Sequence, residues 1–163
     1  MAKDTVSRET VLSLLAAAPD RLAAMTDGLT DEQLKTAPAP GEWSTNDVLA
    51  HLRSCADMWG GGIDTILRRE QTKMRAVNPR HWIKSTDYPV QAFRPSLESF
   101  RVQREGLLRV LDGLSDEEWA LSITATGAGK PLQRTVFSFA ERLAIHERPH
   151  LNQVERVAGT LRG

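Results

Sequence analysis

Apolar residues recur three and four positions apart in four separate stretches of the chain, the spacing that places them on one face of an amphipathic helix. This periodicity predicts helices over about residues 5–27, 44–66, 96–114 and 135–161. No stretch alternates apolar and polar residues convincingly enough to predict a strand. Because each predicted helix is long enough to pack on the others, the pattern predicts an all-α four-helix bundle.

One connection between the predicted helices is much longer than the others. Residues 71–94 show no regular period and contain Pro79 and Pro89. We therefore expect a long crossover between the second and third helices, which could carry the chain from one end of the bundle to the other.

Two shorter connections each begin with a capping box, in which a Ser or Thr and a Glu or Gln three residues later bond each other's backbone N–H. The two boxes are Thr30 with Gln33 and Ser115 with Glu118. Each predicts a short helix after a long one. Their similarity fits either an internal duplication of a helical hairpin or the general frequency of capping boxes.

Helix-breaking residues fall inside three of the predicted long helices. Pro19 predicts a kink or break near Ala18. The run Gly60–Gly62 costs about 0.8–1 kcal/mol per glycine relative to alanine, so it predicts a bend or a thinner helix there. Pro149 removes a backbone donor, but the apolar stripe keeps its phase over residues 136–157. We therefore expect a continuous, distorted last helix.

Composition and charge narrow the class of protein. The length of 163 residues fits one domain over residues 1–163, and the 21 Lys and Arg residues balance 21 Asp and Glu residues. A neutral chain has no global field that attracts nucleic acid or an anionic membrane, so we expect neither partner. A single cysteine excludes an internal disulfide, and no apolar run suits a signal peptide or a membrane span. We expect a cytoplasmic protein.

The charge is unevenly distributed along the chain. Residues 1–60 contain five basic and nine acidic residues, whereas residues 61–110 contain ten basic and five acidic residues. Six of these basic residues lie at the end of the second helix and in the crossover: Arg68, Arg69, Lys73, Arg75, Arg80 and Lys84. They fit either attraction of an acidic thiol or substrate, or an ordinary solvated loop.

Three of the four histidines are placed where they could share one metal ion. His146 and His150 are four residues apart, so both lie on the apolar face of the last helix. His51 lies on the inner face of the second helix. Three imidazoles supply three nitrogen ligands and leave a position open for water or substrate. Hydrogen-bonded core histidines are the alternative, but burying three without a partner is costly, so we favour the metal site. His81, in the basic crossover, is expected to be in solvent.

The last histidine pair also matches H-E-x-x-H, the zinc-protease motif in which the glutamate acts as a base. Pro149 disfavours a regular helix within this motif. Only 13 residues follow His150, and they contain no further histidine. The third ligand therefore has to come from upstream, where His51 can supply it, and a protease is disfavoured.

Four polar residues near the histidines each have more than one interpretation. Asp47 could orient the imidazole of His51, or act as a helix N-terminal carboxylate with Ser44 as the N-cap. Cys55, one turn after His51, could ligate or react, although core packing is the more frequent role of a lone buried cysteine. Arg104 interrupts an apolar stripe, which suggests a buried ion pair, a clamp for a substrate carboxylate, or a surface arginine. Glu147 could serve as a base, but its offset from the histidine face predicts solvent exposure.

Two segments of the chain resemble the DinB-like superfamily. The first is Glu42-Trp43-Ser44 leading into residues 47–52, which include His51. The second is His146-x-x-x-His150 followed by Leu151-Asn152-Gln153. The resemblance covers most of the chain, including the four long helices and the crossover.

This resemblance implies an up-down-down-up bundle, often a homodimer, with a divalent metal on His51, His146 and His150. Its relatives include bacillithiol and mycothiol S-transferases and mycothiol-dependent maleylpyruvate isomerase. Zinc, nickel and iron(II) all suit imidazole ligands. We therefore expect a metal-dependent transferase that joins a low-molecular-weight thiol to a small electrophile. The alternatives are a metal-dependent small-molecule hydrolase, a non-enzymatic metal or ligand-binding protein linked to stress, and a purely structural dimerising bundle.

Overall fold

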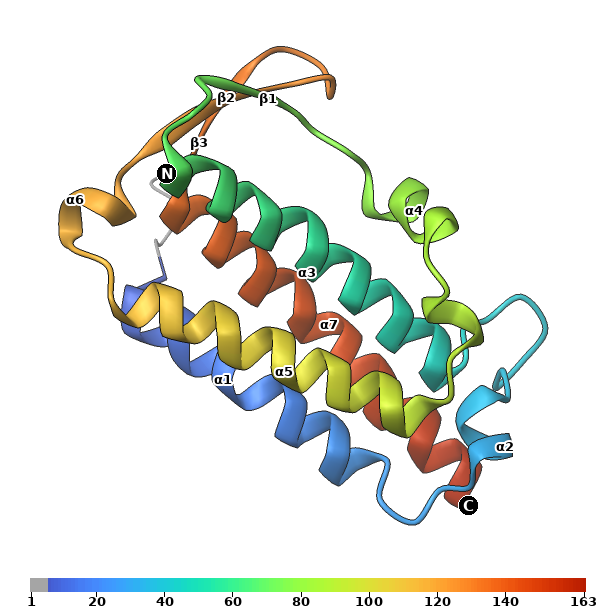
Figure 1. The fold of residues 1–163 in the computed structure, drawn as a ribbon. Coiled ribbons are helices and arrows are strands. Elements are labelled where there is room, and N and C mark those ends of the chain that lie inside the picture. Colours follow the sequence, from blue (N-terminus) through green and yellow to red (C-terminus); the bar gives the residue numbers. More distant parts are fainter. Residues whose placement is uncertain (1–5) are drawn as a thin grey trace, which may run out of the picture.

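Four long helices pack side by side in the computed structural model, which describes residues 6–163 (Figure 1). They are α1 (Arg8–Met25), α3 (Thr45–Arg68), α5 (Phe93–Asp112) and α7 (Val136–Arg162). The four helices expected from the periodicity are therefore present, with small shifts at their ends. Figure 1 shows α1 and α7 running away from the end of the bundle that carries a small sheet, whereas α3 and α5 run toward that end.

Short helices lie in the connections. The two predicted from capping boxes are α2 (Asp31–Lys35) and α6 (Asp116–Trp119), and both boxes are formed. The crossover between α3 and α5 contains α4 (Pro79–Trp82), followed by the 3-10 turns Ile83–Ser85 and Tyr88–Val90. In Figure 1 the crossover runs along the bundle from the sheet to the opposite end.

A three-stranded sheet corrects the all-α prediction. It consists of β1 (Lys73–Arg75), β2 (Ser122–Thr126) and β3 (Leu132–Thr135), in the order β1-β2-β3. β1 is parallel to β2, and β2 is antiparallel to β3. These strands have three to five residues each, which is too short for a convincing alternating pattern. The chain is thus mostly helical with a small sheet.

The helix-breaking residues do not interrupt the long helices. Pro19 lies inside α1, so the alternative of a break there is wrong, and Pro149 lies inside a continuous α7 as expected. Packing of a long apolar face offsets the local cost of proline. α3 also continues through its three glycines. At Gly62 a Cβ would lie 2.8 Å from Cζ of Phe139, so this glycine permits the close approach of α3 and α7.

The core lies between the four long helices. Its largest buried apolar side chains come from all of them, from α2 and from β2: Leu15, Leu22, Leu34, Leu49, Leu52, Ile63, Phe93, Phe100, Leu111, Ile123 and Leu143. Within the described part of the chain, none of the helices combines the length and the apolar composition needed to cross a membrane.

Three polar residues of α3 hold the crossover against the bundle. Asn46 donates to the backbone oxygen of Gln91 at 3.1 Å, and Arg53 donates to the side chain of Gln91 at 2.7 Å. The guanidinium of Arg53 also lies 3.8 Å from the ring centroid of Tyr88. These contacts fix a long connection that has little regular structure of its own.

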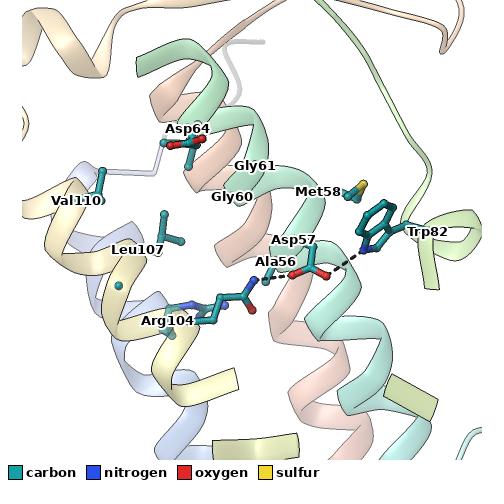
Figure 2. Close-up of a pocket in the computed structure, with 13 residues that line it drawn as sticks. Ala56, Asp57, Met58, Gly60, Gly61, Asp64, Trp82, Arg104, Leu107 and Val110 are labelled. Atoms are coloured by element: carbon teal, nitrogen blue, oxygen red, sulfur yellow. Dashed lines mark hydrogen bonds between the residues drawn. The ribbon is translucent and has the colours of Figure 1, made fainter. Parts of the chain in front are cut away.

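Asp57 is the third of these residues and accepts three hydrogen bonds. Its Oδ2 accepts from Tyr88 at 2.6 Å and from Trp82 at 3.0 Å, and its Oδ1 accepts from Gln103 at 2.7 Å. Figure 2 draws the two bonds from Trp82 and Gln103. The carboxylate therefore joins α3 to the crossover and to α5. It stands beside a cavity of about 460 Å³ between α3 and α5, where Gly60 and Gly106 leave open space.

Tyr88 is the only tyrosine in the chain, so its ionisation can be measured directly. Burial, followed by the hydrogen bond to Asp57 and its charge, raises the pKa of Tyr88 to about 12. We expect the ultraviolet phenolate band to remain weak at about pH 10.5, where an unperturbed tyrosine is mostly ionised. The folded protein holds this proton more tightly than the unfolded chain does. The contribution of protonated Tyr88 to the free energy of unfolding is therefore complete below pH 10 and is lost as the pH rises from 10 toward 12.

Substitution Asp57→Asn should move this titration back toward pH 10. The control is Asp64→Asn, which removes a carboxylate on the same helix that pairs with Arg68 instead. Circular dichroism at each pH identifies the range in which the protein is folded. A normal tyrosine titration in the folded wild-type protein would contradict the assignment.

Candidate metal centre

Three imidazole rings meet between α3 and α7. The ring centroids of His146 and His150 are 4.7 Å apart, those of His51 and His150 are 4.8 Å apart, and those of His51 and His146 are 5.2 Å apart. The i,i+4 spacing places the α7 pair on one face, and the packing of α3 against that face brings in the third ring. The sequence-predicted cluster is therefore formed. His81 is exposed in the crossover, as expected.

Two tryptophans border the histidine cluster. The ring of Trp43 stands 5.1 Å from that of His51, and the ring of Trp59 stands 4.9 Å from that of His146. Neither tryptophan was predicted to be part of the site. Trp59 could have been found, because it lies two helical turns after His51 on the same face of α3.

Burial keeps two of the three imidazoles neutral. Burial is the largest of the effects that lower the pKa of His51 to about 4 and the pKa of His146 to about 4. The neighbouring His150 lowers both further, because two nearby cationic imidazoles repel each other. Both rings are therefore neutral at neutral pH, the form in which an imidazole nitrogen binds a metal.

Hydrogen bonding favours ligation by His150. Its Nδ1 lies 3.1 Å from Oε1 of Gln153, an acceptor, so Nδ1–H donates and leaves the Nε2 lone pair free. Buried Nδ1 of His146 has no hydrogen-bond partner among residues 6–163. A buried, unpartnered imidazole nitrogen is costly unless something binds it.

Cys55 is fully buried beside the histidines. Its Sγ lies 3.6 Å from Nε2 of His51, and donor atoms of Cys55, His51 and His146 all lie within 4.8 Å of one another. Burial, with a smaller effect from the carboxylate of Glu147, raises the pKa of Cys55 to about 12. The sulfur is therefore a protonated thiol in the metal-free protein.

The donor set fits a divalent transition metal. It offers nitrogen from neutral imidazoles, with a thiol nearby, and these are the ligand types of zinc, nickel and iron(II) sites. His150 also lines a shallow cavity of about 340 Å³ with Trp43, Arg80 and Gln153, which gives the cluster a route to solvent. An ion held there could keep a position open for a small molecule.

Asp47 acts as a helix-capping residue. Its Oδ2 accepts from the backbone N–H of Ser44 at 2.9 Å, while the Ser44 hydroxyl accepts from the Asp47 backbone at 3.1 Å. This capping box is the second of its two predicted interpretations. It starts α3 two turns before His51 points inward.

Glu147 and Arg104 form a buried ion pair, which corrects the predicted exposure of Glu147. Both side chains are 2% exposed. Arg104 Nη1 donates to Glu147 Oε2 at 3.0 Å and to the backbone oxygen of Leu15 at 2.9 Å, and its Nη2 also contacts the carboxylate. The exposure was wrong because α7 packs against α1 as well as α3, so two of its faces are buried. Of the interpretations of Arg104, the ion pair is confirmed.

Removal of one partner of this pair should destabilise the fold strongly. Burial raises the pKa of Glu147, and contact with Arg104 opposes that shift. We expect Glu147→Gln to lower the free energy of unfolding by about 3–5 kcal/mol, because a buried guanidinium is left without its counter-charge. The double variant Arg104→Met, Glu147→Leu should recover most of the loss. Urea unfolding measures both.

The control for this experiment is Arg101→Met, which breaks an ion pair with exposed Asp20. Such a surface pair contributes only about 0–1 kcal/mol. A cost of Glu147→Gln no larger than that of the control would contradict a structural role for the buried pair.

The fold and the histidine cluster together define a class of protein: a helical bundle with imidazole donors gathered between two helices. The chain belongs to the DinB superfamily, whose family model matches residues 14–154. No curated protein matches the chain.

A solved structure, that of YfiT from Bacillus subtilis, is similar to this chain with a TM-score of 0.73. The match covers 98% of this chain and 91% of that one, at 16% sequence identity. YfiT is described as a probable metal-dependent hydrolase with an unusual four-helix bundle topology. At this identity the similarity shows a shared fold.

Proposed function

We propose that this protein is a divalent-metal-dependent enzyme in which His51, His146 and His150 hold the ion. The observation that carries the proposal is the convergence of three imidazole rings, with centroids 4.7–5.2 Å apart, between α3 and α7. A purely structural role as hydrogen-bonded core histidines accounts poorly for the cluster, since Nδ1 of His146 has no partner among the described residues.

The proposed reaction joins a low-molecular-weight thiol through its sulfur to a small electrophile: a bond forms between the sulfur and the electrophile, the S–H bond breaks, and the proton and any leaving group of the electrophile pass to water. When bound there, a divalent ion supplies Lewis acidity that lowers the pKa of a thiol or a water molecule beside it. Neutral imidazoles do not cancel the charge of the ion, which favours this chemistry. Gln153 orients one ligand, and the rings of Trp43 and Trp59 border the cluster. The resemblance to thiol S-transferases supports a thiol as the nucleophile.

A metal-dependent hydrolase is the second candidate function. The observation that favours it is the structural similarity to YfiT. The same donor set would then serve a water molecule instead of a thiol. The two reactions differ in their dependence on added thiol, so assays with and without thiol distinguish them.

The proposal also extends to the protein as a whole. We place residues 1–163 in one domain, with the long helices in the up-down-down-up order that their directions in Figure 1 support. The proposed enzyme is a homodimer acting on a small molecule, as the family resemblance implies. We place it in the cytoplasm, since a chain with a single cysteine suits a reducing compartment.

Metal content of purified protein tests the three-histidine site. We expect close to one divalent ion per chain in the wild-type protein, measured by inductively coupled plasma mass spectrometry. His51→Ala, His146→Ala and His150→Ala should each lose most of it, because each removes one of few ligands. His81→Ala is the matched control, since that histidine is exposed in the crossover. Near-stoichiometric metal in all three site variants would refute the site.

The variant Cys55→Ala tests whether Cys55 is a fourth ligand of the ion or whether a coordination position remains free for a small molecule. If the enzyme proposal holds, this variant keeps its metal and consumes bacillithiol, mycothiol or glutathione in the presence of monochlorobimane. Loss of metal as complete as in the histidine variants would instead make Cys55 a fourth ligand and favour a non-enzymatic metal-binding protein. Thiol-independent cleavage of small esters by the wild-type protein, with no thiol consumption, would favour the hydrolase.

A further inference from the structure

A second cavity adjoins the histidine cluster on the side of the sheet. Its volume is about 560 Å³, and it is enclosed by α3, β1, the segment after β1, the β2–β3 hairpin and the first half of α7. Trp59 is part of its wall, and the ring centroid of this tryptophan lies 4.9 Å from that of His146. The cavity and the histidine cluster therefore share Trp59.

Three arginines line this cavity, each from a different element. They are Arg75 of β1, Arg134 of β3 and Arg142 of α7. Among residues 6–163, none of the three forms a salt bridge, although Arg8, Arg68, Arg101 and Arg104 all do. Three unneutralised charges in one concave site create a local positive potential in a chain of zero net charge.

Local structure sets the position of each arginine. Arg134 pairs with buried Ile123 across the β2–β3 hairpin, so it lies on the face of the sheet turned to the bundle. Arg142 lies with its guanidinium 5.1 Å from the ring centroid of Trp59. Arg75 passes Gly127, where φ is +88° and a Cβ would approach the Arg75 side chain to 3.0 Å. Glycine at this turn thus leaves room for the arginine.

Among residues 6–163, Asp57 is the one carboxylate in the cavity wall, and it is already engaged. Its oxygens accept hydrogen bonds from Tyr88 and from Trp82 and Gln103, the last two of which are drawn in Figure 2. The arginines therefore keep their donors available for a ligand. Guanidinium groups bind carboxylates with paired, charge-assisted hydrogen bonds.

Apolar side chains complete the lining. Met58, Met74 and Phe139 lie in the wall, and two large apolar residues that are otherwise unusually exposed stand beside them: Val77, 42% exposed, and Leu132, 49% exposed. Such apolar walls with a few convergent polar groups are typical of small-molecule sites.

We propose that this cavity binds the carboxylate-bearing end of a small apolar organic anion, through Arg75, Arg134 and Arg142. The inference rests on the proposed function, because the ligand is a reactant whose other end reaches the histidine cluster past Trp59. It deepens that function by assigning the substrate class. The carboxylate belongs either to the thiol or to the electrophile.

Binding of 2-naphthoate to metal-free protein, measured by isothermal titration calorimetry, tests this inference. The matched probe is 2-naphthamide, which has the same apolar body but no charge. We expect 2-naphthoate to bind at least about ten-fold more tightly than the amide, because only the carboxylate can pair with the arginines. Arg75→Gln and Arg134→Gln should each reduce this preference, and the double variant, which keeps only Arg142, should lose most of it.

Arg109→Gln is the control, since this arginine is exposed on α5 and does not line the cavity. Equal binding of the two probes to wild-type protein, or an unchanged preference in the double variant, would overturn the inference. His146→Ala should keep the preference for 2-naphthoate. A protein that shows this preference but binds no metal would therefore refute the proposed function alone.

Inhibition of the thiol-transfer assay identifies which reactant carries the carboxylate. Competition of 2-naphthoate with the thiol assigns the cavity to the thiol, and competition with the electrophile assigns it to the electrophile. Either result supports the site when Arg134→Gln weakens the inhibition. Equal inhibition by 2-naphthoate and 2-naphthamide would overturn it.

Discussion

The burial of α7 on two sides governs the chemistry of this protein. α7 packs against α3 on one side and against α1 on the other, so consecutive residues enter different buried environments. His146 faces the imidazoles of His51 and His150, whereas Glu147, the next residue, faces Arg104. A helix with one buried face would leave one of these two residues in solvent. The same packing therefore produces both the histidine cluster and the ion pair.

The ion pair and the histidine cluster offset the cost of losing contact with water in different ways. The carboxylate of Glu147 has a counter-charge and hydrogen bonds, which offset the cost of removing it from water. The imidazoles avoid that cost by remaining neutral, and the lowered pKa values of His51 and His146 reflect this. The ion pair finds its hydrogen-bond partners within the protein. The histidine cluster leaves Nδ1 of His146 without a partner in the described residues, which is the property expected of a binding site rather than of a structural core.

Sequence patterns predicted the parts of the structure that depend on local periodicity. The four long helices, the capping boxes of α2 and α6 and the inward positions of the histidines all follow from spacings of three and four residues. The sheet could not be predicted in this way, because β1 pairs with β2 across about fifty positions of the sequence and each strand is very short. The burial of Glu147 also depends on a distant partner, Arg104. The gathering of Arg75 and Arg134 in one cavity depends in turn on the unpredicted sheet. Each of these features depends on contacts between residues far apart in the sequence, which the pattern of a short stretch cannot reveal.

The direction of the crossover has a consequence for how the protein folds. α3 and α5 run the same way, so the chain must travel the length of the bundle between them before α5 can pack (Figure 1). α1 and α7, at opposite ends of the described chain, also pack on each other. Such distant contacts raise the contact order above that of a bundle built from adjacent hairpins, and a high contact order slows folding. His51 and His146 are separated by 95 positions, so their cluster forms only after the last helix has docked. On a ribosome, the nascent chain would therefore complete this cluster only once α7 had been synthesised and had emerged.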